Sequence, residues 1–347
     1  PLPGAGLALG LSCWLWSGLW SCLFDWEGAK METDTIIETV NLTRNYNHQK
    51  AVDSLSFTVK EGEIFGFLGP NGSGKTTTIR LLLGLLEPTA GQAEVLGLNS
   101  QTQADQIRQL SGALLEHQGL YERLSAFDNL DFYARVWHIP KQKRNIRIQE
   151  LLENFSLWER RSEYVSEWSR GMKQKLAIAR TLLHHPELIF LDEPTAGLDP
   201  VSAAALRDDL AALAEREGVT IFLTTHNLNE AEKLCHKVGV IREGRLLACG
   251  SLTHLQAQAA QPRLQINGSG FTPEVQKHLR SLPVVAGIQQ SNGSIILDLT
   301  NQSESATLVN ILVNAGVQIE EVHMSKVNLE EVFLSMMEAN KDEVHVK

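Results

Sequence analysis

The segment Gly69–Thr76 reads GPNGSGKT, and it constrains the fold more than any other feature of the chain because it fits the pattern G-x-x-x-x-G-K-[ST]. It follows an apolar run typical of a strand, EIFGFL, and opens a run typical of a helix, TTTIRLLLGLL. Glycines let backbone amides curl around phosphate oxygens without Cβ clashes, and the helix N-terminus adds partial positive charge. The sequence therefore predicts an α/β fold with a phosphate-binding loop between a strand and a helix.

This loop also predicts which residues contact a nucleotide and its metal ion. Lys75 should reach the β- and γ-phosphates, and the hydroxyl of Thr76 should ligate Mg²⁺. The residues expected to bind the nucleotide here are Gly69, Pro70, Asn71, Gly72, Ser73, Gly74, Lys75, Thr76 and Thr77.

Two adjacent acids, Asp192 and Glu193, end the apolar run Leu188–Leu191. A carboxylate at the carboxyl end of a parallel strand points into the crevice where open α/β sheets bind ligands. Asp192 is expected to hold Mg²⁺, through water because Mg²⁺ keeps much of its hydration shell. Glu193 is expected to act as the general base that polarises the attacking water.

Short β-rich runs alternate with helical runs from Ile36 to about Gly250. The continuous apolar runs LIFLDE (188–193) and VTIFLTTH (219–226) suit strands buried on both faces of a parallel sheet. Thr76–Leu86 is predicted to be a helix that Pro88 stops.

The stretch Ser125–Leu183 breaks this alternation because it is mainly helical and contains the polar insertion KQKRNIRIQELLENF. We interpret residues 31–250 as one catalytic domain with a helical subdomain at about 119–183. Residues 263–338 are predicted to run strand, helix, strand, strand, helix, strand and a final helix, LEEVFLSMM. That order matches a ferredoxin-like arrangement, so residues 251–347 are predicted to form a small accessory α+β domain.

Composition and charge exclude some function classes. The 347 residues are 43% hydrophobic and 21% charged, with a formal charge of -10. The sequence contains no long basic run, which argues against nucleic acid as a partner. The four cysteines form no CxxC pair, which argues against a disulfide framework and a zinc site and fits a reducing cytoplasm.

The N-terminal segment differs from the rest, because Leu7–Phe24 is 18 residues long and carries no charge. That length just reaches what a membrane span needs, so an anchor or the end of a fused membrane domain is one interpretation. A signal peptide is disfavoured because no Lys or Arg precedes the run. The favoured interpretation is that residues 1–30 precede the native start, since Met31 opens an ordinary polar sequence.

A second Gly-containing turn, WSRGM (168–172), stands ahead of the segment LDEPTAGLDP (191–200), and TTH (224–226) follows it. In this order, the chain from Ile36 to Gly250 resembles the nucleotide-binding domain of ABC transporters. The resemblance implies binding and hydrolysis of ATP with Mg²⁺. It also implies that His226 contacts the γ-phosphate and that Tyr46 stacks on adenine. Ser169 and Gly171 would close on the ATP of a second copy, and Asp199 would reach across that dimer.

The signature turn departs from the family's commonest form, LSGGQ. WSRGMKQK is similar to the YSKGMRQR form of exporters whose ATPase and membrane subunits are separate chains. The position that often carries a Mg²⁺-sensing Gln falls here on Glu116, with Gln118 two residues later. Either residue could serve, and we expect Glu116.

The resemblance therefore predicts an ATPase subunit, as a homodimer, at the cytoplasmic face of the plasma membrane, where it drives export by a separate membrane permease. Residues 116–136 would receive a coupling helix of that permease. The alternatives are a soluble ABC-type ATPase acting on DNA or the ribosome, and a membrane-fused half-transporter that depends on residues 1–30. DNA-acting relatives carry a long coiled-coil insertion and ribosome-acting relatives two cassettes, and neither feature is found here.

Overall fold

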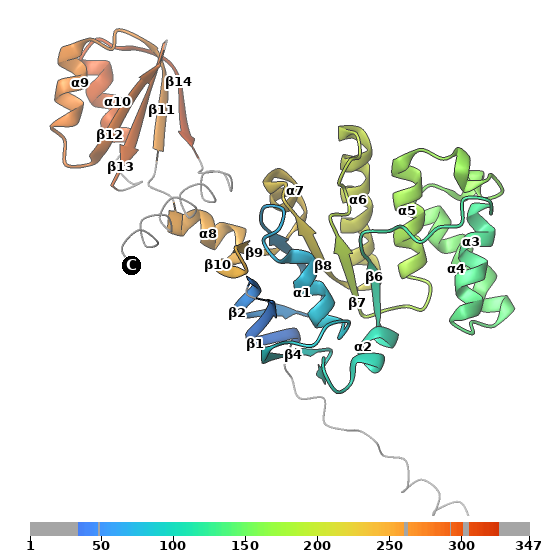
Figure 1. The fold of residues 1–347 in the computed structure, drawn as a ribbon. Helices are drawn as coiled ribbons and strands as arrows, with labels where there is room; N and C mark the ends of the chain where they lie inside the picture. Colours follow the sequence, from blue (N-terminus) through green and yellow to red (C-terminus); the bar gives the residue numbers. More distant parts are fainter. Residues whose placement is uncertain (1–33, 48, 260–262, 292, 301–304, 326–347) are drawn as a thin grey trace, which may run out of the picture. The chain divides into compact units, whose positions relative to one another are not determined.

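The computed structural model describes residues 34–47, 49–259, 263–291, 293–300 and 305–325, and the strands among them form three sheets (Figure 1). The predictions for residues 1–30 and for a helix at 329–337 lie outside these residues. No helix in the described ranges is both long and apolar enough to span a bilayer.

A six-stranded sheet with the order β10-β9-β3-β8-β7-β6 carries the phosphate loop. All neighbouring strands in it are parallel except β10, which returns antiparallel to β9. Every residue of β8 is buried, and so is every residue of β7 before Asp192, as the two continuous apolar runs predicted. Every residue of β3 is buried as well. The strands are β3 (Ile64–Leu68), β6 (Ser111–Leu114), β7 (Leu188–Asp192), β8 (Thr220–Thr225), β9 (Lys237–Arg242) and β10 (Arg245–Ser251).

An antiparallel sheet with the order β2-β1-β4-β5 shares a hydrophobic core with this six-stranded sheet. Phe57 of the antiparallel sheet stacks on Phe65 with ring centroids 5.6 Å apart, and Phe222 lies 6.2 Å from Phe57. This core backs the phosphate loop with close-packed aromatic rings. The strands are β1 (Thr35–Tyr46), β2 (Gln49–Lys60), β4 (Ala90–Val95) and β5 (Leu98–Asn99).

The helix after the phosphate loop is shorter than predicted, because α1 ends at Leu82 and not at Leu86. Gly84 adopts a left-handed conformation with φ 62°, its N–H bonds to Leu81 O, and Leu85 N–H bonds to Arg80 O. These two bonds form a Schellman motif, which satisfies the last carbonyls and ends the helix at glycine, ahead of Pro88. The other helices around this sheet are α2 (Ala104–Leu110), α6 (Pro200–Glu217), α7 (Leu228–Leu234) and α8 (Leu252–Ala259), with α1 spanning Lys75–Leu82.

The predicted helical stretch contains α3 (Ala126–Val136), α4 (Lys141–Asn154) and α5 (Arg170–Thr181), with short 3₁₀ turns at Trp158–Arg160 and Val165–Glu167. The polar insertion is α4, and it is amphipathic. Ile148, Leu151 and Leu152 are buried in a core that also contains Leu176 of α5 and Ile189 of β7. Helical region and sheet are therefore joined by a common core, and the predicted α/β fold is confirmed.

The third sheet is antiparallel with the order β12-β13-β11-β14, and α9 and α10 contribute Leu279 and Leu308 to its core. Element and strand order are those of the split βαβ arrangement that the sequence predicted. That residues 251–347 form a separate domain stays a prediction. The elements are β11 (Arg263–Ser269), α9 (Pro273–Arg280), β12 (Val285–Ser291), β13 (Ser294–Leu299), α10 (Ser305–Asn314) and β14 (Gln318–Ser325).

Candidate functional site

The phosphate loop connects the end of β3 to the start of α1. Gly74 has φ 108°, and a Cβ on it would lie 2.4 Å from the carbonyl oxygen of Ala51, so only glycine fits this position. The first backbone bond of the helix runs from Thr78 N–H to Gly74 O at 2.9 Å. The amides of Lys75, Thr76 and Thr77 precede that bond and are free to receive an anion at the helix N-terminus.

The ammonium group of Lys75 is held above this loop. Lys75 is 6% exposed, and its Nζ donates to Gly69 O at 2.7 Å and to Pro70 O at 3.2 Å. The same Nζ lies 3.1 Å from Glu193 Oε1. Two carbonyls therefore anchor the cation between the loop and Glu193, which follows β7.

Asp192 stands at the end of β7, beside the first turn of α1. Its Oδ2 accepts a hydrogen bond from Thr76 Oγ1 at 2.7 Å, and its Oδ1 accepts one from Thr224 Oγ1 at 2.5 Å. A hydroxyl and a carboxylate side by side are the hard oxygen ligands that suit Mg²⁺. The pair therefore fits that ion chemically.

Glu193 and His226 follow the ends of the adjacent strands β7 and β8. Glu193 Oε2 lies 2.8 Å from His226 Nδ1, and the Glu193 backbone has φ 50°, which is uncommon for a residue with a side chain. The Glu193 amide donates to both the carbonyl and the hydroxyl oxygen of Thr224, at 3.1 and 3.0 Å. This turn aims the Glu193 side chain between Lys75 and His226.

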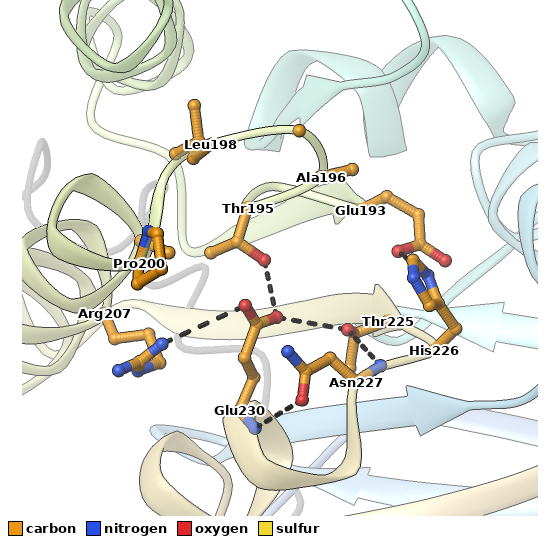
Figure 2. Close-up of a pocket in the computed structure, with 12 residues that line it drawn as sticks. Glu193, Thr195, Ala196, Leu198, Pro200, Arg207, Thr225, His226, Asn227 and Glu230 are labelled. Atoms are coloured by element: carbon orange, nitrogen blue, oxygen red, sulfur yellow. Dashed lines mark hydrogen bonds and ion pairs between the residues drawn. The ribbon is translucent and has the colours of Figure 1, made fainter.

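Two cavities meet at His226. One, of about 330 Å³, is lined by Gly69, Pro70, Asn71, His226 and Leu228. The other, of about 340 Å³, lies between the loop after Glu193 and the start of α7, and Figure 2 shows the side chains that line it.

The two predicted cross-dimer segments pack against each other. Ser169 caps α5 by accepting from Met172 N–H at 3.3 Å, and Asp199 caps α6 by accepting from Ser202 N–H at 3.0 Å. A Cβ on Gly171 would lie 3.0 Å from Ser202 Oγ, so the two helix starts touch. The hydrogen bonds of Ser169 and Asp199 therefore run within their own helix ends and do not join them to Lys75.

The carboxylate of Asp199 accepts hydrogen bonds from three donors, the amides of Val201 and Ser202 and the hydroxyl of Ser202. The hydroxyl and amide of Ser202 hold the pKa of Asp199 below its usual range, and the amide of Val201 adds to this effect. Asp199 is exposed, so its carboxylate faces solvent.

Tyr46 ends β1, and its side chain is 42% exposed. The guanidinium carbon of Arg44 lies 4.9 Å from the centre of the Tyr46 ring. One face of the ring is therefore covered by a cation, a favourable arrangement for an aromatic ring. The next strand, β2, carries Ala51, whose carbonyl approaches Gly74.

Glu116 forms an ion pair with Arg80 at 2.9 Å, and its side chain is 59% exposed. Gln118 donates to Gln174 Oε1 of α5, also at 2.9 Å. Neither of these contacts involves Asp192, so the assignment of Glu116 to the metal site stays a prediction.

Several side chains that the sequence did not single out belong to this site. Thr224 bonds to Asp192 and Glu193, and Glu230 bonds to Thr195 and Thr225. The available signal was a pair of threonines just before His226 and one threonine two residues after Glu193. Threonines in an apolar strand carry hydroxyls that need partners when buried, which would have marked them as candidates.

With this geometry in place, comparison with known proteins identifies the family. The family model described as ABC transporter matches residues 52–196. The chain is 38% identical over 306 residues to the bacitracin transport ATP-binding protein BcrA of Bacillus licheniformis, covering 87% of this chain and 97% of that protein. It is 33% identical over 318 residues to the daunorubicin resistance ATP-binding protein DrrA3 of Streptomyces coeruleorubidus, covering 87% and 96%.

A solved structure agrees with these sequence relatives. The protein cbiO1 of Clostridium perfringens, described as part of the ABC transporter complex cbiONQ, superposes with a TM-score of 0.61 and 27% identity over 65% of this chain and 92% of that one. The chain belongs to the ABC transporter family, as an ATP-binding subunit with ATPase activity.

Proposed function

We propose that this ATPase subunit powers export through a separate membrane permease, and that it works as a homodimer at the cytoplasmic face of the membrane. One observation carries the assignment of the site. Lys75, the Thr76–Asp192 pair and the Glu193–His226 pair converge at the carboxyl ends of β3, β7 and β8.

The phosphates of ATP would lie on the first turn of α1. The free amides there and the cation of Lys75 would neutralise their charge. Mg²⁺ would be held by Thr76 and Asp192, where it would neutralise part of the phosphate charge.

Glu193 would hold the attacking water and accept its proton. His226 Nδ1 would keep the Glu193 carboxylate oriented, which leaves Nε2 for the γ-phosphate. Lys75 lies 3.1 Å from the other Glu193 oxygen, so the carboxylate is held from two sides.

Three residues that make no hydrogen bond to Lys75 support the proposal of a homodimer. Ser169, Gly171 and Asp199 would complete the site of the second copy, because their own contacts only cap and pack α5 and α6. ATP favours closure only through contacts that the open form lacks, and these residues would provide them. Tyr46 would stack on adenine with its uncovered face.

The permease would dock on the exposed aromatic surface of the helical region. Tyr121 and Phe132 are 47% and 41% exposed with ring centroids 5.0 Å apart, and Val136 is 59% exposed. Large apolar side chains gathered on a surface mark a binding face. The relatives are named for bacitracin transport and daunorubicin resistance, which supports export as the direction. Residues 251–347 would support the dimer.

The test is a pair of substitutions in the purified chain. Glu193→Gln keeps the shape of the side chain and removes the base, so we expect ATP binding, loss of hydrolysis and an ATP-dependent dimer by light scattering. Lys75→Ala is expected to abolish binding or hydrolysis. A Glu193→Gln protein that stays monomeric in saturating ATP and Mg²⁺ would refute the shared site, and full activity of Lys75→Ala would remove Lys75 from it.

A further inference from the structure

Glu230 is a buried acid behind the proposed catalytic pair. It lies in the first turn of α7 and is only 9% exposed. Its Oε2 accepts hydrogen bonds from Thr195 Oγ1 at 2.5 Å and Thr225 Oγ1 at 3.2 Å, and its Oε1 lies 3.9 Å from Arg207 Nη1 (Figure 2). Burying a carboxylate is costly without partners, and here three separate segments supply them.

Glu230 also holds the chain on both sides of His226. Thr225 precedes His226, and its Oγ1 also accepts from Asn227 N–H at 3.0 Å. Asn227 follows His226, and its Oδ1 accepts from Glu230 N–H at 3.4 Å. The turn that presents His226 is therefore tied to the Glu230 carboxylate through Thr225 and to the Glu230 backbone amide through Asn227 (Figure 2).

The bond from Thr195 to Glu230 holds the loop after Glu193. Thr195 is two residues beyond Glu193 and is 8% exposed, so its hydroxyl has little access to water. Glu193 itself has φ 50°, a conformation that the surrounding structure must impose. The bond from Thr195 to Glu230 is one such constraint, and it is accepted by the same carboxylate oxygen, Oε2, that accepts the bond from Thr225.

We infer that Glu230 is a positioning residue for ATP hydrolysis, because its carboxylate joins the loop after Glu193 to the turn carrying His226 and so sets the 2.8 Å contact between them. The inference rests on the roles proposed above for Glu193 and His226. The Glu230 carboxylate is already engaged by Thr195 and Thr225, so it acts on the geometry of Glu193 and His226 and not on the nucleotide. Its loss should lower kcat and leave ATP affinity unchanged.

The mildest test acts on Thr195. Thr195→Val removes the hydroxyl and keeps the shape, whereas Thr195→Ser keeps the hydroxyl. We expect Thr195→Val to lower kcat about tenfold, the order that one lost hydrogen bond to a charged group produces. The Kd for ATP should stay within twofold, and Thr195→Ser should restore most of the activity. Glu230→Gln should also lower kcat, while Glu215→Gln, at an exposed position on α6, serves as the matched control and leaves it unchanged.

Hydrogen exchange gives a readout that does not depend on turnover. Thr195→Val should speed exchange at the amides of Thr225–Glu230, which are distant in sequence, and leave the amides of β13 unchanged. Unchanged kcat in Thr195→Val would overturn the inference, and so would faster exchange everywhere with a parallel loss of ATP binding. Glu193→Gln is measured beside it: an active Glu193→Gln overturns the proposed function, while an inactive one with normal Thr195→Val overturns only the role of Glu230.

Discussion

An ion pair between Arg147 and Glu217 ties α4 of the helical region to the end of α6. Arg147 Nη1 and Nη2 lie 3.0 and 2.8 Å from the two oxygens of Glu217, and Nη2 also donates to Leu182 O at 2.8 Å. The side chains are 7% and 19% exposed. Arg147→Met keeps the unbranched aliphatic part of the side chain and removes the guanidinium, so the Glu217 carboxylate loses its partner.

The size of the effect follows from this burial. Removing one partner of a buried ion pair costs about 3–5 kcal/mol. Glu217 keeps some contact with water, so we expect the lower end, about 3 kcal/mol. At about 1.4 kcal/mol for each factor of ten, opening of α4 becomes about 150 times more frequent.

Hydrogen exchange measured by mass spectrometry reports this opening locally, which matters because a chain of this size does not unfold in one step. Peptides from α4 should exchange about 150 times faster in Arg147→Met. The double variant Arg147→Met/Glu217→Met removes both charges, so its exchange should return to within about tenfold of the wild type. Peptides from β13 should not change, and they serve as the internal control.

Two results would refute the reasoning. Exchange of α4 within fivefold of the wild type in Arg147→Met would mean that the pair contributes little to the attachment of α4. A double variant as fast as the single one would mean that the lost packing, and not the stranded charge, causes the effect.

Three further predictions test other contacts. Gly197 has φ 71°, and a Cβ there would lie 2.3 Å from Arg170 Nη1. Gly197→Ala should therefore lower the free energy of unfolding by about 1–2 kcal/mol and lower Tm by several degrees in calorimetry. The decrease in Tm should be smaller when Gly197→Ala is introduced together with Arg170→Ala. Burial lowers the pKa of His184, whose ring stacks on Trp137 with ring centroids 3.9 Å apart. The unfolded state therefore binds more protons, and the free energy of unfolding falls as pH drops below about 6.5. His184→Gln should flatten this pH dependence in urea titrations at pH 7 and 5.5. Burial raises the pKa of Cys235 to about 12, so iodoacetamide at pH 8 should modify it in urea but not in the native protein, and modification of the native protein would contradict this.

Features with a local cause were predicted well from the sequence. The strand–loop–helix around Lys75 depends on neighbouring glycines and on the start of a helix, and the buried strands β7 and β8 depend on their own apolar residues. The predicted end of α1 was wrong by four residues, because Gly84 ends the helix in a left-handed conformation. A Cβ on Gly84 would lie 2.4 Å from Ser100 O and from Ala104 Cβ, a close approach that only the folded chain shows.

The sequence by itself determined the phosphate loop, the acids at the end of β7 and the α/β class, since each is written in adjacent residues. Only the tertiary structure decided which of these groups meet. Thr76 and Asp192 are 116 positions apart, and they bond because the strand order β3-β8-β7 brings the ends of these strands together. The same strand order brings Thr195 and Thr225 to the carboxylate of Glu230. No sequence periodicity relates these three residues, so only the packing of the whole sheet determines that they bond.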